Sequence, residues 1–508
     1  MSDSRTTKSV KNIGFEFFNQ LLSFLLRFIS RKVFISVLSV EYLGINGLFA
    51  EVLQMLSLAD LGFGTAMIYS FYKPLAEGDE RKVAALIGYY RKIYTYIAVA
   101  VAAVGILVVP FLDVIVNTEK EIPFLKVYYL LNLANTVRTY LFVYKTSLIT
   151  ADQKQYIISK YNAIWNMINV LAQIVVLLIF KNYILYLAVS VVIGIANNIF
   201  ISCKADQLYP IIKQKVNLEK EEKGSIFRNI KSMFIYKLSG TLLNTTDNTL
   251  ISMLLGTVWV GYYSNYNLIL HYVNLFIWVV FSSVTASIGN LIVEETEEKR
   301  YQVFECLQVV SYVICGIAAP CLLFLMEDLI RIWLGAQFIV DQLLVLAIVM
   351  NFYLGAILRP IWSYREATGL YMKTKYVMLC TAALNLILSI WWGIELGLAG
   401  IVFASAASRV LTYIWYEPYL LFKEYFKKNV LVFYWKMVKN IFGVIMLCMI
   451  CEMTGGNLQI NTWGGLIIKA VIIGCVSLVG MLLFYWKTEG FQLILAKAYQ
   501  ILGKETTR

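Results

Sequence analysis

The sequence lacks the motifs by which soluble enzymes are usually recognised. It contains no GxxxxGK[ST] phosphate loop, no GxSxG nucleophile elbow and no HExxH zinc motif. Its single histidine, His271, and its eight cysteines are not spaced as metal ligands. Only 15% of the 508 residues are charged, whereas 59% are hydrophobic. This composition excludes a water-soluble fold, and we expect a protein that is not an enzyme and that holds neither a metal nor a cofactor.

Long polar segments are also absent, so no stretch can form a separate extramembrane domain. Apolar windows of about 20 residues predict fourteen membrane-spanning helices, separated by short polar turns or by turns that contain Gly or Pro. The predicted spans lie near 12–39, 43–71, 84–112, 125–148, 157–180, 183–202, 232–255, 259–291, 302–325, 337–358, 376–393, 398–421, 440–452 and 464–486. The predicted fold class is therefore an all-α integral membrane protein.

Basic residues are concentrated on one side of the predicted membrane. If the N-terminus is cytoplasmic, the cytoplasmic segments, which include 203–224, 359–375 and 422–439, hold 28 Lys and Arg residues, and the opposite face holds three. Because short cytoplasmic loops carry an excess of positive charge, we expect both termini in the cytoplasm. The net charge of +12 thus reflects topology. No nucleic-acid partner is predicted, since the basic residues are spread over eight segments.

A weak internal repeat divides the chain into halves. The segment 34–38 (FISVL), followed by Gly44, is echoed by 250–254 (LISML), followed by Gly261, at an offset of 216 residues plus one insertion. Chance similarity between two apolar helices is the alternative explanation. The repeat predicts two pseudo-symmetric six-helix bundles that meet at a central cleft, with two further helices at the end. The predicted domains are an N-lobe (1–205), a cytoplasmic connecting loop (206–226), a C-lobe (227–422), helices thirteen and fourteen (423–487) and an interfacial amphipathic tail (488–508).

Polar residues form a stripe along the first predicted span. Glu16, Gln20, Ser23, Arg27 and Arg31 recur every three or four residues, so they share one face of an α-helix whose other side is apolar. Such a helix faces lipid on one side and a hydrated cavity on the other. A cation near the bilayer centre costs about 2.5–3.5 kcal/mol, so these arginines require water or a partner.

Two interpretations of the cations inside the spans stay open. In one, they line a cavity and offer donors to a phosphate or diphosphate group; these candidates are Arg27, Arg31, Lys32, Arg138 and Lys237. In the other, they pair with intramembrane acids and hold the bundle together. Polar residues that could couple transport to protons or cations, or line the cavity, are Glu16, Glu51, Asp60, Asn244, Asp247 and His271.

Three segments carry a resemblance to a known family. The stretch KNIGFEFFNQLLSFLLRFISRKVFISVLSVEYLGINGLFAEVLQMLSLADLGFGTAMIYSFYKPLAEGD resembles the N-terminal half of Wzx-type polysaccharide transporters. These belong to the multidrug/oligosaccharidyl-lipid/polysaccharide (MOP) exporter superfamily. The segment NTTDNTLISMLLGTVWVGYYSNYNLI resembles the opening of that superfamily's second lobe, and RPIWSYREATGLYMKTKYVMLCTAALNLILS resembles its tenth and eleventh spans.

The resemblance implies a flippase of the bacterial cytoplasmic membrane. Such a protein carries a polyprenyl-diphosphate-linked oligosaccharide from the cytoplasmic to the outer leaflet by alternating access, for capsule, exopolysaccharide or surface-antigen synthesis. Cations on the first helix are a feature of these flippases, and Arg27 and Arg31 match by their place on the first span. The implied partners are the lipid-linked substrate, membrane lipids, glycosyltransferases and a polysaccharide polymerase.

Three alternatives stay open. A flippase for the peptidoglycan lipid precursor also binds a diphosphate in a cationic cleft. A cation-coupled small-molecule exporter of the same superfamily favours an acidic, aromatic cavity, which the arginine stripe does not match. A membrane enzyme that acts on lipid-linked sugars needs a catalytic constellation in an external loop, and the sequence has none.

Overall fold

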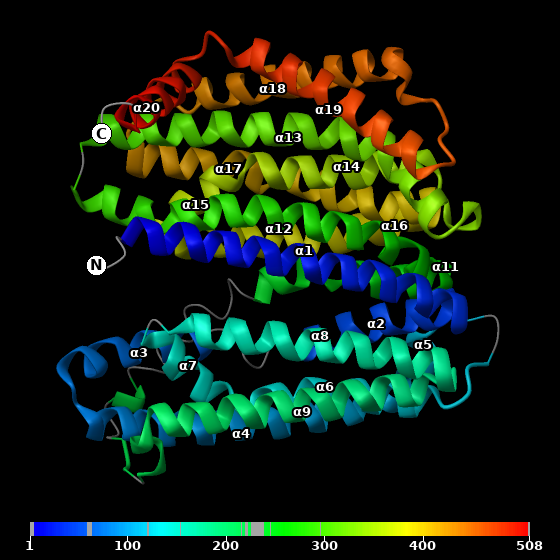
Figure 1. Ribbon diagram of the computed structural model, residues 1–508, viewed down its shortest axis with the longest axis vertical. Helices are drawn as coiled ribbons and strands as arrows, with labels where there is room; N and C mark the ends of the chain where they lie inside the picture. Colours follow the sequence, from blue (N-terminus) through cyan, green and yellow to red (C-terminus); the bar gives the residue numbers. More distant parts are fainter. Residues whose placement is uncertain are drawn as a thin grey trace. The chain divides into compact units, whose positions relative to one another are not determined.

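The computed structural model describes residues 5–57, 63–118, 121–152, 154–214, 216–218, 222–224, 238–243, 245–294 and 296–505, and the regular structure in these ranges is entirely helical (Figure 1). The first helices are α1 (Arg5–Val37), α2 (Val40–Leu56), α3 (Phe63–Glu77), α4 (Glu80–Val108), η2 (Val109–Phe111), α5 (Leu112–Ile115), α6 (Leu125–Tyr140), α7 (Val143–Ala151), α8 (Gln155–Phe180), α9 (Tyr183–Leu208), η3 (Pro210–Lys213) and α11 (Asp247–Leu255). They are followed by α12 (Thr257–Glu294), α13 (Glu297–Trp333), η4 (Ala336–Phe338), α14 (Gln342–Ile357), α15 (Arg359–Ala367), α16 (Tyr371–Leu411), α17 (Tyr413–Leu421), η5 (Phe422–Phe426), α18 (Leu431–Cys451), η6 (Glu452–Gly456), α19 (Trp463–Tyr485) and α20 (Glu489–Glu505).

The helices coincide with the predicted spans, and the all-α fold class is confirmed. Each of the fourteen spans falls on one helix or on two or three consecutive helices, although the seventh, 232–255, is described only over 238–243 and 245–255. Within the described part of the chain, seven helices are long and apolar enough to cross a membrane, and the bent pair α14–α15 is an eighth candidate. The chain is a multi-pass membrane protein.

One long helix contains two predicted spans. The model runs α16 from Tyr371 to Leu411, but Gly397 interrupts it with φ 62° and ψ −141°, between the spans predicted at 376–393 and 398–421. Only glycine adopts this conformation without strain, because it has no Cβ. The break therefore separates the eleventh and twelfth spans where the sequence places it.

The chain divides into two compact units, residues 1–264 and 265–508. In the first, α8 packs against α1 and α9, while α6 packs against α9, α4 and α2. Aromatic rings fill the centre of this unit: the Tyr183 ring contacts Phe34, Tyr42 and Tyr128 at centroid distances of 4.8–5.8 Å. The predicted lobe boundary at 206–226 stays a prediction.

The second unit is organised around α13. This helix packs against α14, α18, α19 and α20, and α14 in turn packs against α16. A buried ion network fixes the end of α13: Asp328 accepts from Lys469 on α19 at 2.6 Å and from Arg331 at 3.1 Å. Because each of these ions has a partner of opposite charge, none of the three is left uncompensated in the apolar interior.

Two glycines allow α2 and the start of α12 to cross at very short range. A Cβ on Gly44 would lie 2.0 Å from the carbonyl oxygen of Thr257, and a Cβ on Gly261 would lie 2.5 Å from that of Val40. These contacts are reciprocal, since one offset of 217 residues maps Val40 onto Thr257 and Gly44 onto Gly261. Gly44 contacts the counterpart of Val40, and Gly261 contacts Val40 itself. Two segments that are related by a two-fold axis contact each other in this reciprocal way. The crossing therefore supports the pseudo-symmetry that the repeat predicts.

We expect Gly44→Ala and Gly261→Ala each to destabilise the protein by about 1–3 kcal/mol, because the added methyl group meets backbone atoms that cannot rotate away. Thermal unfolding of the purified protein in detergent measures the loss. The matched control is Gly474→Ala on α19, where a Cβ would have open space. If all three variants unfold at the same temperature, the close crossing is wrong.

Candidate functional site

The first helix has two exposed faces of different chemistry. Leu21, Leu25 and Ile29 are 40%, 48% and 54% exposed. Arg27 and Arg31 each follow one of these apolar residues by two positions, or about 200° around the helix, so the cations lie on the opposite side. Arg27 is exposed and Arg31 is half-buried. One side of α1 thus suits lipid, and the other presents guanidinium groups.

The end of the polar stripe at Arg31 faces α9 and the start of α12. Arg31 donates from Nη1 to the hydroxyl of Ser264 at 2.8 Å. Tyr186 on α9 and Arg27 are both near enough to interact electrostatically with Arg31. Arg27 forms no ion pair within the described residues. The two guanidinium groups are therefore close to each other, and an anion between them would relieve their repulsion.

A carboxylate occupies the corresponding place in the second repeat. The offset of 216 residues, which applies before the insertion, maps Arg31 onto Asp247, and Glu51 on α2 accepts a hydrogen bond from the backbone N–H of the next residue, Asn248, at 2.9 Å. Glu51 therefore caps the N-terminus of α11, where the unsatisfied N–H groups and the helix dipole favour a negative charge. Asp247 also interacts electrostatically with Glu51. These contacts bring Glu51 and Asp247 together and give Glu51 a structural role that does not involve Arg27 or Arg31.

Arg138 lies at a separate place on α6. Its Nε donates to Asn135 at 2.8 Å, and its guanidinium carbon occupies space that a Cβ on Gly194 of α9 would approach to 2.0 Å. Gly194 and Tyr186, the α9 neighbours of Arg138 and Arg31, are eight residues apart, or about 12 Å along the helix. Arg138 therefore contributes positive potential to this region at a distance.

The other predicted site residues are exposed on their helices or lie outside the described residues. Lys32 is exposed on α1, next to the apolar face. His271 is exposed on α12 in the second unit, and its ring contacts Tyr272 at 5.4 Å. Asp60, Lys237 and Asn244 lie outside the described residues, as does the side chain of Glu16.

Sequence reasoning missed a buried ion pair in the second unit. The segment 359–375 is predicted as a cytoplasmic loop, but its first part forms α15, and Arg365 is buried in an ion pair with Glu417. Trp362 donates to the same carboxylate at 2.8 Å. Arg409 donates to Asn351 at 2.7 Å. The amphipathic pattern of 359–367 was the available signal, but the partner Glu417 is 52 residues away and no local pattern announces it.

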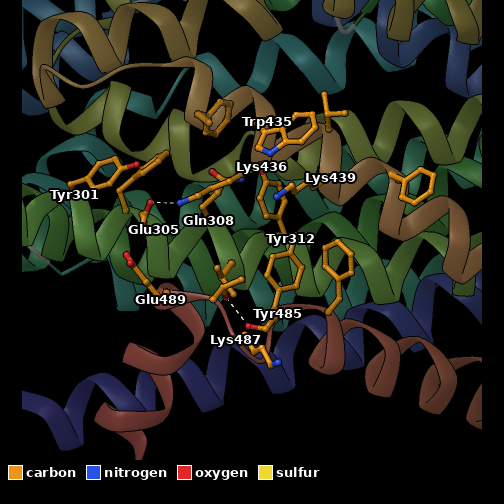
Figure 2. Close-up of a pocket in the computed structure, with 18 of the residues that line it drawn as sticks. Tyr301, Glu305, Gln308, Tyr312, Trp435, Lys436, Lys439, Tyr485, Lys487 and Glu489 are labelled. Carbon is orange, nitrogen blue, oxygen red and sulfur yellow. Dashed lines mark hydrogen bonds and ion pairs between the residues drawn. The ribbon is translucent and has the colours of Figure 1, made fainter.

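The second unit also contains a cavity of about 910 Å³ between α13, α18 and the α19–α20 connection (Figure 2). Its inner wall is aromatic, with Phe304, Tyr312 and Tyr485 all buried. Charges at its edge largely compensate: Lys436 pairs with Glu305, and Lys439 lies over the Trp435 ring at 5.2 Å. This cavity has no marked preference for one sign of charge.

Comparison with solved structures gives extensive matches. A lipid II flippase MurJ in an inward closed conformation superposes with a TM-score of 0.68 and 15% identity, over 92% of this chain and 98% of that chain. An inward-facing multidrug resistance MATE family transporter of the MOP superfamily gives a TM-score of 0.58 and 12% identity, over 78% and 94%. A MATE transporter of Vibrio cholerae gives 0.53 and 14%, over 84% and 99%.

The chain has the fold of these transporters. No family model and no curated protein matches its sequence. The superposition with the lipid II flippase covers 92% of this chain. Fold does not identify a substrate, which has to be argued from the site.

We expect Glu51→Ala to destabilise the protein by about 1–3 kcal/mol, because it removes the acceptor at the N-terminus of α11. Glu51→Gln retains an acceptor oxygen, so it should lose less and should keep transport activity. Thermal unfolding in detergent and a transport assay in vesicles measure the two effects. Glu77→Ala, at an exposed and weakly paired position on α3, is the control. Full stability of both Glu51 variants with loss of transport in Glu51→Gln would contradict the structural role.

Proposed function

We propose that this protein is a flippase for a polyprenyl-diphosphate-linked oligosaccharide, which it moves from the cytoplasmic to the outer leaflet for the assembly of a surface polysaccharide. The observation that carries the proposal is the pair of neighbouring arginines on α1, of which Arg27 forms no ion pair within the described residues. A diphosphate is the ligand that such a pair suits.

The spacing of the two arginines fits two linked phosphates. Positions 27 and 31 are one helical turn apart, or about 6 Å along the axis. Each guanidinium donates two parallel hydrogen bonds to phosphate oxygens. Placing a cation in the apolar region of the membrane costs about 2.5–3.5 kcal/mol. A bound anion offsets part of this cost. Arg138 adds positive potential further along α9.

The division of α1 into two faces supports a lipid-linked substrate. Such a molecule has an anionic head that needs cations and a hydrocarbon tail that stays in the bilayer. Leu21, Leu25 and Ile29 present an apolar surface on the same helix that carries the arginines. The head can therefore bind on one side of α1 while the tail remains in lipid. A water-soluble cationic drug would gain nothing from this arrangement and would be repelled by the arginines.

Alternating access follows from the two-fold relation of the repeats. We place the protein in the bacterial cytoplasmic membrane with both termini in the cytoplasm. Glycosyltransferases would supply its substrate and a polysaccharide polymerase would consume the product.

A flippase for the peptidoglycan lipid precursor is the second candidate. The match to the lipid II flippase covers 92% of this chain with a TM-score of 0.68, above the values of the two MATE transporters. Both candidates bind a diphosphate, so Arg27 and Arg31 serve either one. The sugar attached to the diphosphate distinguishes them.

We expect Arg27→Ala and Arg31→Ala each to lose most flipping of a labelled polyprenyl-diphosphate sugar in vesicles, because a buried phosphate loses a paired donor. Arg27→Lys and Arg31→Lys should retain partial activity, since an ammonium keeps the charge without the planar fork. Lys126→Ala, at an exposed position on α6, should flip at the wild-type rate.

Competition separates the two candidates in the same assay. Unlabelled polysaccharide precursor should inhibit flipping at lower concentration than the peptidoglycan precursor. The reverse order would replace the first candidate with the second. Undiminished flipping by both well-folded alanine variants would remove the arginines from the site.

A further inference from the structure

The first unit contains a second charged cavity, distant in sequence from the arginine stripe. It measures about 990 Å³ and lies between the first half of α4, the start of α7, the end of α9 and residues 212, 214 and 216–218. Among the described residues, its lining includes Arg91, Lys92, Lys145 and Lys223, against a single acid, Asp206. The cavity is therefore strongly cationic.

The single acid of the cavity is already neutralised. Lys145, which is 8% exposed, donates to Asp206 and to Ser202, both at 2.7 Å. In the described part of the chain, neither Arg91, Lys92 nor Lys223 forms an ion pair. Three uncompensated cations thus surround one cavity, and their mutual repulsion favours an anion between them.

Two contacts of the segment 222–224 hold Lys223 at the cavity. Glu222 pairs with Lys82 at 2.5 Å, which ties the segment 222–224 to the start of α4. The next residue, Lys223, lies over the Tyr89 ring with its Nζ 5.8 Å from the ring centroid. Glu222 therefore fixes this short segment to α4, and Lys223 is available to a ligand in the cavity.

The surface beside the cavity is apolar and continues along α4. Tyr96, Val99 and Leu107 are 73%, 62% and 69% exposed, and with Ala103 they form one stripe at intervals of three or four residues. The stripe begins within one turn of Lys92 and runs toward the other end of the span. Arg91 and Lys92 lie seven or eight residues inside the predicted span 84–112, from which long basic side chains reach the headgroup layer.

We propose that this cavity binds the headgroup phosphate of an anionic phospholipid of the surrounding cytoplasmic leaflet, with the acyl chains along the exposed stripe of α4. Basic cavities between membrane helices on this side suit anionic headgroups, and tyrosine is favoured at headgroup level. The cavity volume suits a glycerophosphate headgroup and the first carbons of the chains. This site is separate from the arginines of α1, and its occupant is not transported.

The test is native mass spectrometry of the full-length protein in detergent with phosphatidylglycerol or phosphatidylcholine of identical chains. We expect one phosphatidylglycerol to bind in preference to phosphatidylcholine. Each interfacial cation contributes on the order of five-fold to the binding of an anionic lipid. The double variant Arg91→Gln and Lys92→Gln should therefore bind phosphatidylglycerol about 25-fold more weakly than the wild type. Lys439→Gln combined with Lys487→Gln, which removes the same charge at the cavity of the second unit, should leave it unchanged.

Two further arms keep the result decisive. Lys223 lies beyond the membrane helices, so Lys223→Gln tests the site if the double variant does not fold. This variant should bind phosphatidylglycerol about five-fold more weakly than the wild type. A polyprenyl phosphate added as competitor identifies the source of the phosphate. The proposal is overturned if the two phospholipids bind equally, if the variants at Arg91, Lys92 and Lys223 bind as the wild type does, or if polyprenyl phosphate displaces phosphatidylglycerol at equal concentration.

Discussion

The crossing of α2 and α12 is the backbone contact that positions the polar side chains of the first unit's site. Gly44 and Gly261 bring two backbones to a distance that no side chain permits. Without a hydrophobic driving force between helices in lipid, such close packing is a principal source of association. The same crossing brings Ser264 to Arg31 and Asn248 to Glu51. Both polar contacts therefore follow from a backbone approach that two glycines allow.

The cations inside the helices fall into two groups. Lys145, Lys469 and Arg365 each have a carboxylate partner, which compensates the cost of burying charge. Arg27 and the three cations around the α4 cavity have no such partner within the described residues. A cation without a partner is costly inside the membrane, and in the headgroup layer it attracts anionic groups. We therefore assign the second group to ligands of opposite charge.

The sequence predicted the helices better than their side-chain contacts. Hydropathy located the long helices, and Gly397 interrupts α16 between two predicted spans, because both features depend on local composition. The polar stripe on α1 could also be predicted, because it depends only on the spacing of residues within one helix. By contrast, Arg31 meets Ser264 across 233 residues, and Arg365 meets Glu417 across 52. Such pairs depend on how distant helices pack, so the fold of 359–367 as a helix and the capping role of Glu51 could not be predicted.

A structure of the protein with a bound polyprenyl-diphosphate sugar tests the central claim most directly. The account predicts that both phosphates lie on the α1 stripe, with guanidinium nitrogens of Arg27 and Arg31 about 2.7–2.9 Å from phosphate oxygens. It also predicts that the hydrocarbon chain leaves toward the face of Leu21, Leu25 and Ile29. A headgroup bound elsewhere, with both arginines paired to carboxylates of the protein, would contradict it.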